Sequence, residues 1–299
     1  MQIWILFVLL AQFIWSICSL IDKIVISKGY IKNPFVYIIL NGAMNVLLIF
    51  ILPFFNFEPL RFADFLIALL SASAITMAII LYYKAVQYEE ISRISIMFNF
   101  IPVFTLLASF LLLGEILTKN HLTGFLFLVL GGIVISYKKA GKSFRISKAA
   151  YYMAASAVFV AIAYISAKHI LRITGFWSAV LWFRLTSFVA LLALFVPSVR
   201  KEFIRNFRVM KKNIKGLLGF KMVIDFSAFI ISDFALLLGP VSLVSALSSS
   251  SAPVFVFALS SLMSVYFPYL VKEDISIKTI LTKLFAIALI IIGIVFVNI

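Results

Sequence analysis

The chain has few acidic residues, few histidines and a single cysteine. Asp and Glu together number 11 in 299 residues, and the two histidines, His121 and His169, are far apart in the sequence. With Cys18 as the lone thiol, no disulfide or cysteine metal site can form within the chain. The sequence shows neither a nucleophile–base arrangement nor an aspartate-rich cluster. We therefore expect no enzyme, no bound metal and no cofactor.

Charged residues of both signs are also scarce, at 12% of the chain, whereas hydrophobic residues make up 64%. A soluble domain needs more polar surface than this, so we expect an integral membrane protein. The apolar runs are about 20 residues long, which as helix covers the roughly 30 Å hydrocarbon core, and the alternating ten-residue segments of a membrane barrel are absent. The sequence predicts an all-α fold of ten transmembrane helices, near 3–22, 34–55, 64–84, 92–113, 120–137, 149–169, 177–197, 216–237, 242–267 and 278–297.

The 26 basic residues give a formal net charge of +15, and most of them lie in short connections on one side of the predicted helices. They are found in these connections rather than on an amphipathic face or in a separate domain. We therefore interpret them as a topology signal and not as a nucleic-acid site. By the positive-inside rule, both termini lie outside the cytoplasm, and the protein is a multi-pass protein of the cell membrane.

The tripeptide Pro-Val-Phe occurs at 102–104 and again at 253–255, each time in the fourth predicted span of its half. A five-span unit that occurs twice explains this placement. We therefore expect two five-helix repeats, residues 1–140 and 141–299. An odd number of spans makes the second repeat enter the membrane the opposite way round. A binding site is then expected near the midplane, between two inverted repeats.

Several features of the first half together resemble the EamA-like domain of the drug/metabolite transporter superfamily. They are Trp15 with Lys23 eight residues later, Pro102-Val103-Phe104, the closing Gly114-Glu115, Gly124, and Gly131-Gly132. The second half resembles the domain through Pro253-Val254-Phe255, through Lys168 or His169 where the first-span lysine would recur, and through Arg184 early in its second span. The resemblance implies secondary transport or facilitated export of small metabolites, without an ATPase and without a bound cofactor.

Ionisable side chains inside predicted spans should face protein or a water-filled cavity, because exposure to lipid costs at least a few kcal/mol. Lys221 and Asp225, spaced i,i+4, share one helix face and are expected to pair. The pair is either a gate or substrate-polarity site, or a static pair that lets the span sit in lipid. Arg184 has no carboxylate within four residues, so its partner comes from another helix, a carbonyl group or a solute, with Asp225 as one candidate.

Pro102 and Pro253 each remove a helix hydrogen bond within a predicted span. They are predicted to kink matching helices beside the solute path, although a packing role explains them equally. Four serines, 248–251, accompany the second proline, whereas Asn99 is the polar residue near the first. The two walls of a central cavity are therefore expected to differ, one apolar and one rich in hydroxyl groups.

Aromatic side chains with a polar edge can bind an amine or an amphipathic solute beside a cavity, although interfacial belts also contain them. The candidates of this kind are Trp15, Tyr82, Tyr83, Tyr164 and Trp182. Lys23 and Lys168 end their spans, where a lysine either marks the interface or faces the solute path. The predicted binding or gating residues are Trp15, Lys23, Tyr83, Asn99, Pro102, Tyr164, Lys168, Arg184, Lys221, Asp225, Ser249 and Pro253.

The leading hypothesis is a secondary carrier or facilitator that moves a small organic metabolite, such as an amino acid, by alternating access between the repeats. Amino acids, other small metabolites and hydrophobic cations all stay open as solutes. The alternatives are a membrane-embedded enzyme that modifies lipid, a channel-like subunit, and a receptor or scaffold. The expected partners are the solute and the lipid bilayer. A coupling proton or ion and a monomeric or homodimeric state are left open.

Overall fold

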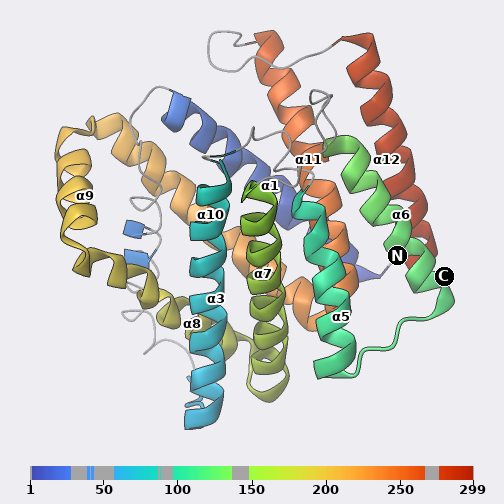
Figure 1. Ribbon diagram of the computed structural model, residues 1–299, viewed down its shortest axis with the longest axis horizontal. Helices are drawn as coiled ribbons and strands as arrows, with labels where there is room; N and C mark the ends of the chain where they lie inside the picture. Colours follow the sequence, from blue (N-terminus) through green and yellow to red (C-terminus); the bar gives the residue numbers. More distant parts are fainter. Residues whose placement is uncertain are drawn as a thin grey trace.

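The computed structural model describes residues 2–27, 39–40, 42–43, 57–86, 88, 97–136, 148–266 and 276–298, and every element in these ranges is a helix (Figure 1). The α-helices are α1 (Ile3–Ser27), α3 (Phe62–Val86), α5 (Ile101–Leu113), α6 (Lys119–Ser136), α7 (Lys148–Ile173), α8 (Phe176–Thr186), α9 (Pro197–Val209), α10 (Lys212–Leu238), α11 (Val241–Tyr266) and α12 (Ile277–Asn298). Two 3-10 helices adjoin them, η2 (Phe98–Phe100) before α5 and η3 (Ser187–Phe195) after α8.

Each predicted span except 34–55, most of which lies outside the described residues, coincides with a helical element. Within the described ranges, six segments are long and apolar enough to cross a membrane, namely α1, α3, α7, the continuous α8–η3 segment, α11 and α12. Helices α5 and α6 are apolar but shorter, whereas α10 carries Lys221, Asp225 and Asp233 within its apolar sequence. The described part of the chain is therefore entirely helical in its elements and is that of a multi-pass membrane protein, and the count of ten spans stays a prediction.

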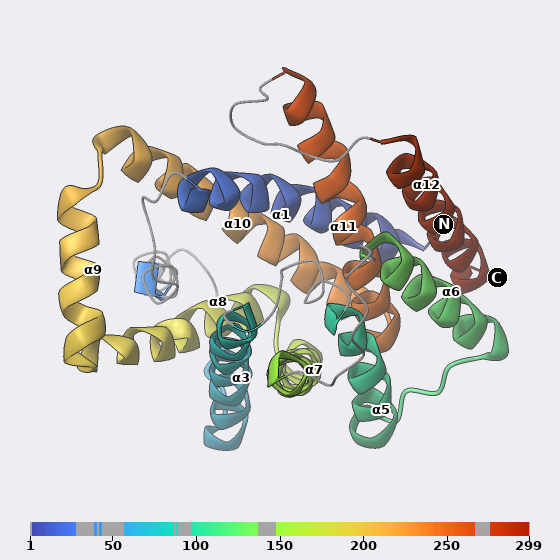
Figure 2. The ribbon, with the colours of Figure 1, turned by 45° about the horizontal axis from the view of Figure 1, so that its top comes forward.

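Helices from opposite halves of the sequence pack against one another throughout the bundle. Helix α3 packs along α7, α1 along α10, and α6 along α12, while α5 also contacts α7 and α11 contacts α1. Figure 2 shows α1 and α10 side by side across the upper part of the molecule. The largest group of buried apolar side chains, which includes Ile5, Leu128, Ile170, Leu243 and Leu247, lies among these helices.

The contact between α6 and α12 depends on glycines. A Cβ atom added at Gly124 would lie 2.6 Å from Cγ2 of Val297 and 2.8 Å from the carbonyl oxygen of Gly293. One added at Gly131 would lie 2.6 Å from the side chain of Ile290. Lipid tails are as apolar as leucine, so close backbone approach holds membrane helices together better than hydrophobicity does. The glycines of the fifth predicted span thus serve the packing of the first half against the second.

Two charged side chains hold the turn that joins α10 to α11. Lys168 on α7 donates from Nζ to three carbonyl oxygens at the C-terminal end of α10, at 2.5, 2.9 and 2.9 Å. Glu115, just after α5, accepts the N–H of Val241 with its two carboxylate oxygens, at 3.0 and 3.1 Å. A helix C-terminus attracts a cation and an N-terminus an anion, so each charge complements a helix end. The structure thus gives Lys168 a role in fixing the α10–α11 turn.

Glu58 anchors the segment before α3 to the start of α8. Its Oε2 accepts the hydroxyl of Thr174 at 2.6 Å and the N–H of Gly175 at 2.9 Å. Its own carbonyl oxygen accepts the indole N–H of Trp182 at 3.0 Å. The hydroxyl of Thr174 and then the N–H of Gly175 favour the charged carboxylate, so they hold the pKa of Glu58 below its ordinary value.

The two matching prolines occupy different places in their helices. Pro102 is buried in the first turn of α5, directly after η2, where a helix has no intrahelical use for the N–H that proline lacks. Pro253 lies inside α11, where it does remove a hydrogen bond between turns. The structure therefore corrects the prediction of two equivalent kinks, because Pro102 marks the start of an α-helix.

Candidate functional site

A cavity of about 550 Å³ lies among α1, α3, α7, α8, η3 and α10. Its walls come from both predicted repeats, since α1 and α3 belong to the first and the other helices to the second. A volume of this size is typical of a small-molecule site. The lining is mostly apolar, and its polar or ionisable side chains are those of Trp15, Ser71, Thr76, Tyr164, Arg184, Ser187, Asp225, Ser232 and Asp233.

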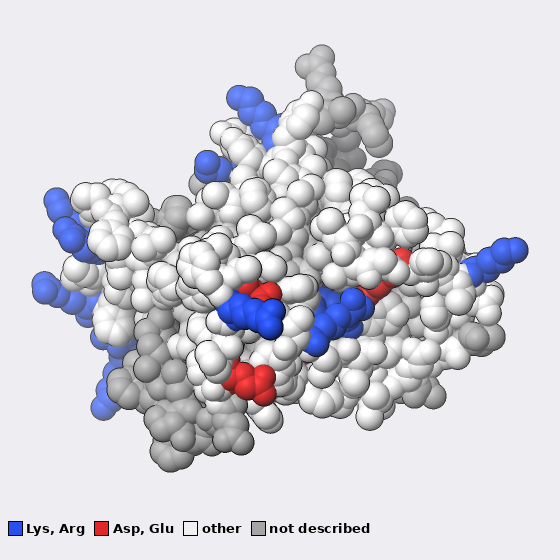
Figure 3. Space-filling view, turned by 90° about the horizontal axis from the view of Figure 1, so that it is seen from below, with Lys and Arg blue, Asp and Glu red and all other residues white. Residues whose placement is uncertain are grey.

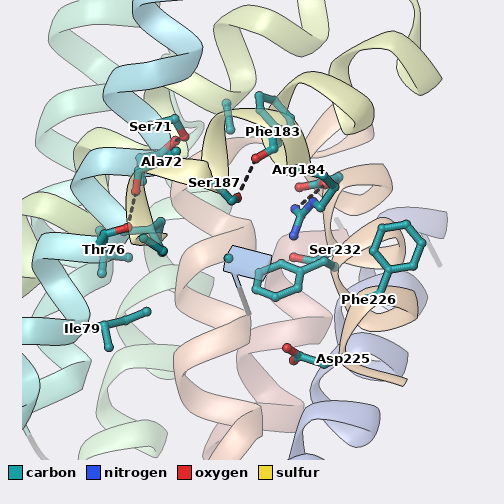
Figure 4. Close-up of a pocket in the computed structure, with 18 of the residues that line it drawn as sticks. Ser71, Ala72, Thr76, Ile79, Phe183, Arg184, Ser187, Asp225, Phe226 and Ser232 are labelled. Carbon is teal, nitrogen blue, oxygen red and sulfur yellow. Dashed lines mark hydrogen bonds and ion pairs between the residues drawn. The ribbon is translucent and has the colours of Figure 1, made fainter. Parts of the chain in front are cut away.

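Helix α10 contributes the most ionisable wall of this cavity. Met222, Asp225, Phe229, Ser232 and Leu236 recur at intervals of three and four residues, so their side chains share one face of the helix. Figure 4 shows Asp225 and Ser232 following one another along this wall, with Arg184 of α8 facing the same space. Two of the charged residues that make α10 less apolar than the other spans, Asp225 and Asp233, face the cavity. Lys221 is also charged but lies outside the cavity lining.

Arg184 pairs with Asp233 inside the protein. The guanidinium Nη2 lies 3.4 Å from Oδ2 of Asp233, and the two side chains are only 8% and 12% exposed. The guanidinium carbon also lies 4.4 Å from the ring centroid of Phe229, a cation–π distance. Removing one member of such a buried pair leaves an uncompensated charge, which typically costs about 3–5 kcal/mol. The partner that Arg184 needs from another helix is thus Asp233 rather than Asp225.

Asp225 is bound by a tryptophan from the other half of the chain. The indole Nε1 of Trp15 donates to Oδ1 of Asp225 at 2.9 Å. The ring of Trp15 also meets the edge of Phe229, with centroids 5.0 Å apart. Phe229 therefore contacts both Trp15 and Arg184, and it separates the two acidic side chains of the wall. This arrangement gives the cavity two carboxyl groups, one guanidinium and a group of aromatic rings.

Lys221 points away from the cavity toward α1. Its Nζ lies 3.5 Å from Oδ2 of Asp22, and the lysine side chain is 8% exposed. Lys221 thus forms an ion pair with Asp22 of α1, while Asp225 accepts a hydrogen bond from Trp15 of α1. Lys221 also acts on Asp225 electrostatically, so the predicted pairing of these two residues stays a prediction. Spacing along one helix does not reveal the contacts with α1.

The predicted residues divide into three groups. Trp15, Tyr164, Arg184 and Asp225 line the cavity. Those that lie outside its lining are Asn99, Pro102, Lys168, Lys221, Ser249 and Pro253. The side chains of Lys23 and Tyr83 lie outside the described residues. Where a residue stands apart from the cavity, its role in gating stays a prediction.

Sequence reasoning missed Asp233 and Phe229. The signal was present, because Lys221, Asp225, Phe229 and Asp233 follow one another at four-residue intervals in the eighth predicted span. Such a run places one group above the next along a helix, and a full run points to a polar face more strongly than a single pair does. Beyond Lys221 and Asp225, the same run contains Asp233, which is the partner of Arg184, and Phe229, whose ring contacts Arg184.

Comparisons with known proteins give a similar family for the first half of the chain and a similar fold for the whole of it. The model of the EamA-like transporter family, part of the drug/metabolite transporter superfamily, matches residues 2–137. A solved structure described only as "Crystal structure of protein" aligns over 100% of this chain and 99% of its own, with a TM-score of 0.67 and 16% sequence identity. At that identity the likeness concerns the fold alone. No curated protein matches the chain.

Proposed function

We propose that this membrane transporter is a carrier for a small organic solute with a positively charged group. The match of residues 2–137 to the EamA-like transporter family supports this proposal. The cavity is its binding site, in the cell membrane. Residues 1–140 and 141–299 are the two inverted five-helix repeats that move relative to each other, with both termini outside the cytoplasm. The observation that carries the proposal is a cavity lined from both halves, with ionisable groups at the depth of apolar helices.

The packing of the helices supports the inverted repeat. If α1 corresponds to α7 and α3 to α10, exchanging the halves turns the α3–α7 contact into the α10–α1 contact, and both contacts exist. If α5 corresponds to α11, the same exchange turns α5–α7 into α11–α1, and both of these exist as well. The pairs α6–α12 and α5–α11 map onto themselves. A two-fold relation between the halves accounts for these pairs, although the contact of α6 with α11 has no comparable counterpart between the described residues of α12 and α5.

The charges of the lining favour a positively charged group on the solute. Arg184 is already engaged by Asp233 and by the ring of Phe229. Among the described residues, Trp15 is the hydrogen-bond donor that contacts Asp225. An ammonium group beside Asp225 would gain a carboxylate and the faces of nearby rings, a combination that attracts cations. A solute with both an amino and a carboxyl group would find its second partner in Nε of Arg184, a buried nitrogen to which the described residues supply no hydrogen-bond partner.

The same contacts suggest how binding acts on the two halves. The Trp15–Asp225 hydrogen bond joins α1 of the first half to α10 of the second, whereas Arg184 and Asp233 both belong to the second. An ammonium group that occupies Asp225 competes with the indole N–H and so weakens a tie between the halves. A solute can shift the balance between two states only by contacts that differ between them. The contact of the ammonium group with Asp225 is proposed to be of this kind, because it replaces the Trp15–Asp225 hydrogen bond.

Flux measurements in proteoliposomes test the proposal. The purified chain is reconstituted and offered amino acids, other amines, neutral metabolites and organic anions, with and without the same solute inside. Saturable uptake of amine-bearing solutes that speeds up with solute on the opposite side supports the carrier. Uptake of neutral or anionic solutes alone would overturn the charge preference. Inertness toward the whole panel, together with lipid turnover, would instead favour the membrane-embedded enzyme.

A further inference from the structure

Helix α9 stands out from the rest of the described chain. None of its thirteen residues is buried, and it packs chiefly against η3. Its apolar side chains are well exposed, with Ile204 at 44%, Phe207 at 42% and Val209 at 79%. The residues just before it, Phe195 and Val196, are exposed as well. A helix with this much exposed apolar surface needs a covering that the described part of the protein does not supply.

The position of α9 places it at the level of a membrane surface. It connects the end of the apolar α8–η3 segment to the start of α10. Figure 2 shows it at one end of the molecule, running across the direction of α1 and α10 rather than along it. A helix that runs across the ends of membrane-spanning helices lies in the plane of the interface. An amphipathic helix in that plane can bury its apolar side chains at the boundary between headgroups and acyl chains.

One face of α9 is basic. Lys201, Arg205 and Arg208 follow one another at i, i+4 and i+7, and with Ile204 and Val209 they line a shallow hollow of about 340 Å³. Figure 3 shows Lys and Arg gathered at the edge of the molecule where α9 lies. These basic residues do lie in a connection, as expected, but the expectation that they do not lie on an amphipathic face is wrong for this segment.

The opposite side of the helix is fixed to the protein. Phe203 packs against the cluster formed by Ile21, Met210 and their neighbours, and its ring stacks on Phe207 with centroids 6.0 Å apart. Nζ of Lys215, on α10, lies 4.5 Å from the Phe207 ring centroid. These contacts hold the rotation of α9 about its axis, so the basic face keeps a defined direction.

We propose that α9 binds the headgroup of an anionic phospholipid in the cytoplasmic leaflet. The phosphate contacts Lys201, Arg205 and Arg208, and the upper acyl chain meets Ile204 and Val209. Clusters of basic residues next to spans attract anionic lipid, and guanidinium groups make paired hydrogen bonds with phosphate. A second copy of the chain fits this face poorly, because it would bring two sets of basic side chains together.

Lipid binding is measured on the purified full-length protein in a neutral detergent, without any transport solute. Phosphatidylglycerol or phosphatidylcholine is titrated in, and bound lipid is counted by native mass spectrometry. We expect phosphatidylglycerol to bind the wild type, and 0.5 M salt to weaken that binding. The variant Lys201→Gln/Arg205→Gln/Arg208→Gln should bind it at least about tenfold more weakly, since each cation near an anionic surface contributes appreciably.

The matched control is Arg61→Gln/Lys119→Gln/Arg172→Gln, which removes the same charge from exposed residues at other connections. It should bind phosphatidylglycerol within about twofold of wild type. Equal loss in both variants, or equal affinity for the two lipids, would overturn the proposal. So would a dimer that the α9 variant abolishes, because a second copy would then be the occupant. Because no solute is present, failure of the carrier hypothesis leaves this result unaffected.

Discussion

The indole N–H of Trp15 lies 2.9 Å from the carboxylate of Asp225, although 210 residues separate them in the chain. The hydrogen bond joins α1 to α10 at the wall of the cavity, and the same ring rests against Phe229. One contact therefore links the two halves of the sequence, the candidate binding site and the acidic group on which the proposed solute preference depends.

Trp15→Phe should bind an amine-bearing solute more tightly and yet transport it more slowly. The phenyl ring keeps the aromatic surface, but it cannot donate to Asp225, so the solute no longer competes for the carboxylate. Equilibrium binding and proteoliposome flux check the two effects separately. Trp177→Phe, whose ring is 49% exposed, is the control and should leave both unchanged. Weaker binding together with slower flux would contradict the competition.

Asp225→Asn should reduce flux of amine-bearing solutes by about tenfold or more, since a charge-assisted hydrogen bond contributes about 1.5–3 kcal/mol. The amide still accepts from Trp15, so the fold should persist. Uptake is compared with that of Asp64→Asn, a carboxylate at the start of α3 that lies outside the cavity lining. If the two variants transport equally well, Asp225 does not bind the solute.

Arg184→Gln should destabilise the protein by about 3–5 kcal/mol, because Asp233 is then buried without its cation. Adding Asp233→Asn should restore most of the stability, since the variant pair contains no buried charge. Unfolding in mild detergent, followed by circular dichroism, measures both. The double variant has lost the guanidinium next to the solute, so its flux should stay impaired. Recovery of flux along with stability would show that the pair is purely structural.

Lys168→Met should lower stability and leave solute affinity unchanged. The change removes three hydrogen bonds from a charged donor to the end of α10, each contributing about 1.5–3 kcal/mol. One acceptor is the carbonyl oxygen of Leu236 on the cavity face, but the charged side chains of Arg184, Asp225 and Asp233 are left in place. Thermal unfolding and equilibrium solute binding are measured in parallel. Lys119→Met, at an exposed position, controls for the loss of one charge. A drop in affinity at unchanged stability would place Lys168 in the solute path after all.

The anchor at Glu58 should weaken in acid. Its pKa in the folded protein lies below the ordinary value of 4.5, mainly because of the Thr174 hydroxyl. The stabilisation is therefore complete above pH 4.5 and is lost as the pH falls through the lower, folded-state pKa. The protection factor of the Gly175 amide, which corrects for the intrinsic slowing of exchange in acid, should fall across that range in the wild type, and less so in Glu58→Gln. Parallel pH profiles in the two proteins would assign the acid sensitivity to another group.

The sequence allows the helices to be predicted well because apolar runs of fixed length are a local property. Residues 64–84 and 242–267, for example, were predicted as spans and correspond to α3 and α11 within two residues. The same pattern missed α9, since a short basic stretch with a few apolar residues does not form an apolar run. Trp15, Tyr164, Arg184 and Asp225 were candidates because each is a polar group within an apolar segment, and all four line one cavity. Their role in binding or gating stays a prediction.

The partners of these groups could not be predicted in the same way. Asp22 and Lys221 meet only because α1 packs along α10, and Arg184 meets Asp233 across two helices of the second half. Such contacts depend on how helices are arranged in space, which the spacing along one helix does not contain. The same holds for Pro102, whose place at the start of α5 depends on where the 3-10 turn ends.

Three ionisable residues within the apolar sequence of α10, Lys221, Asp225 and Asp233, have a consequence for how the protein is made. Each has its counterpart earlier in the chain, at Asp22 and Trp15 in α1 and at Arg184 in α8. These three partners are therefore synthesised before α10 leaves the exit tunnel of the ribosome. A segment that is too polar to insert into the bilayer alone can then insert next to helices that are already present. The order of synthesis thus helps α10 to insert into the membrane despite its charged residues.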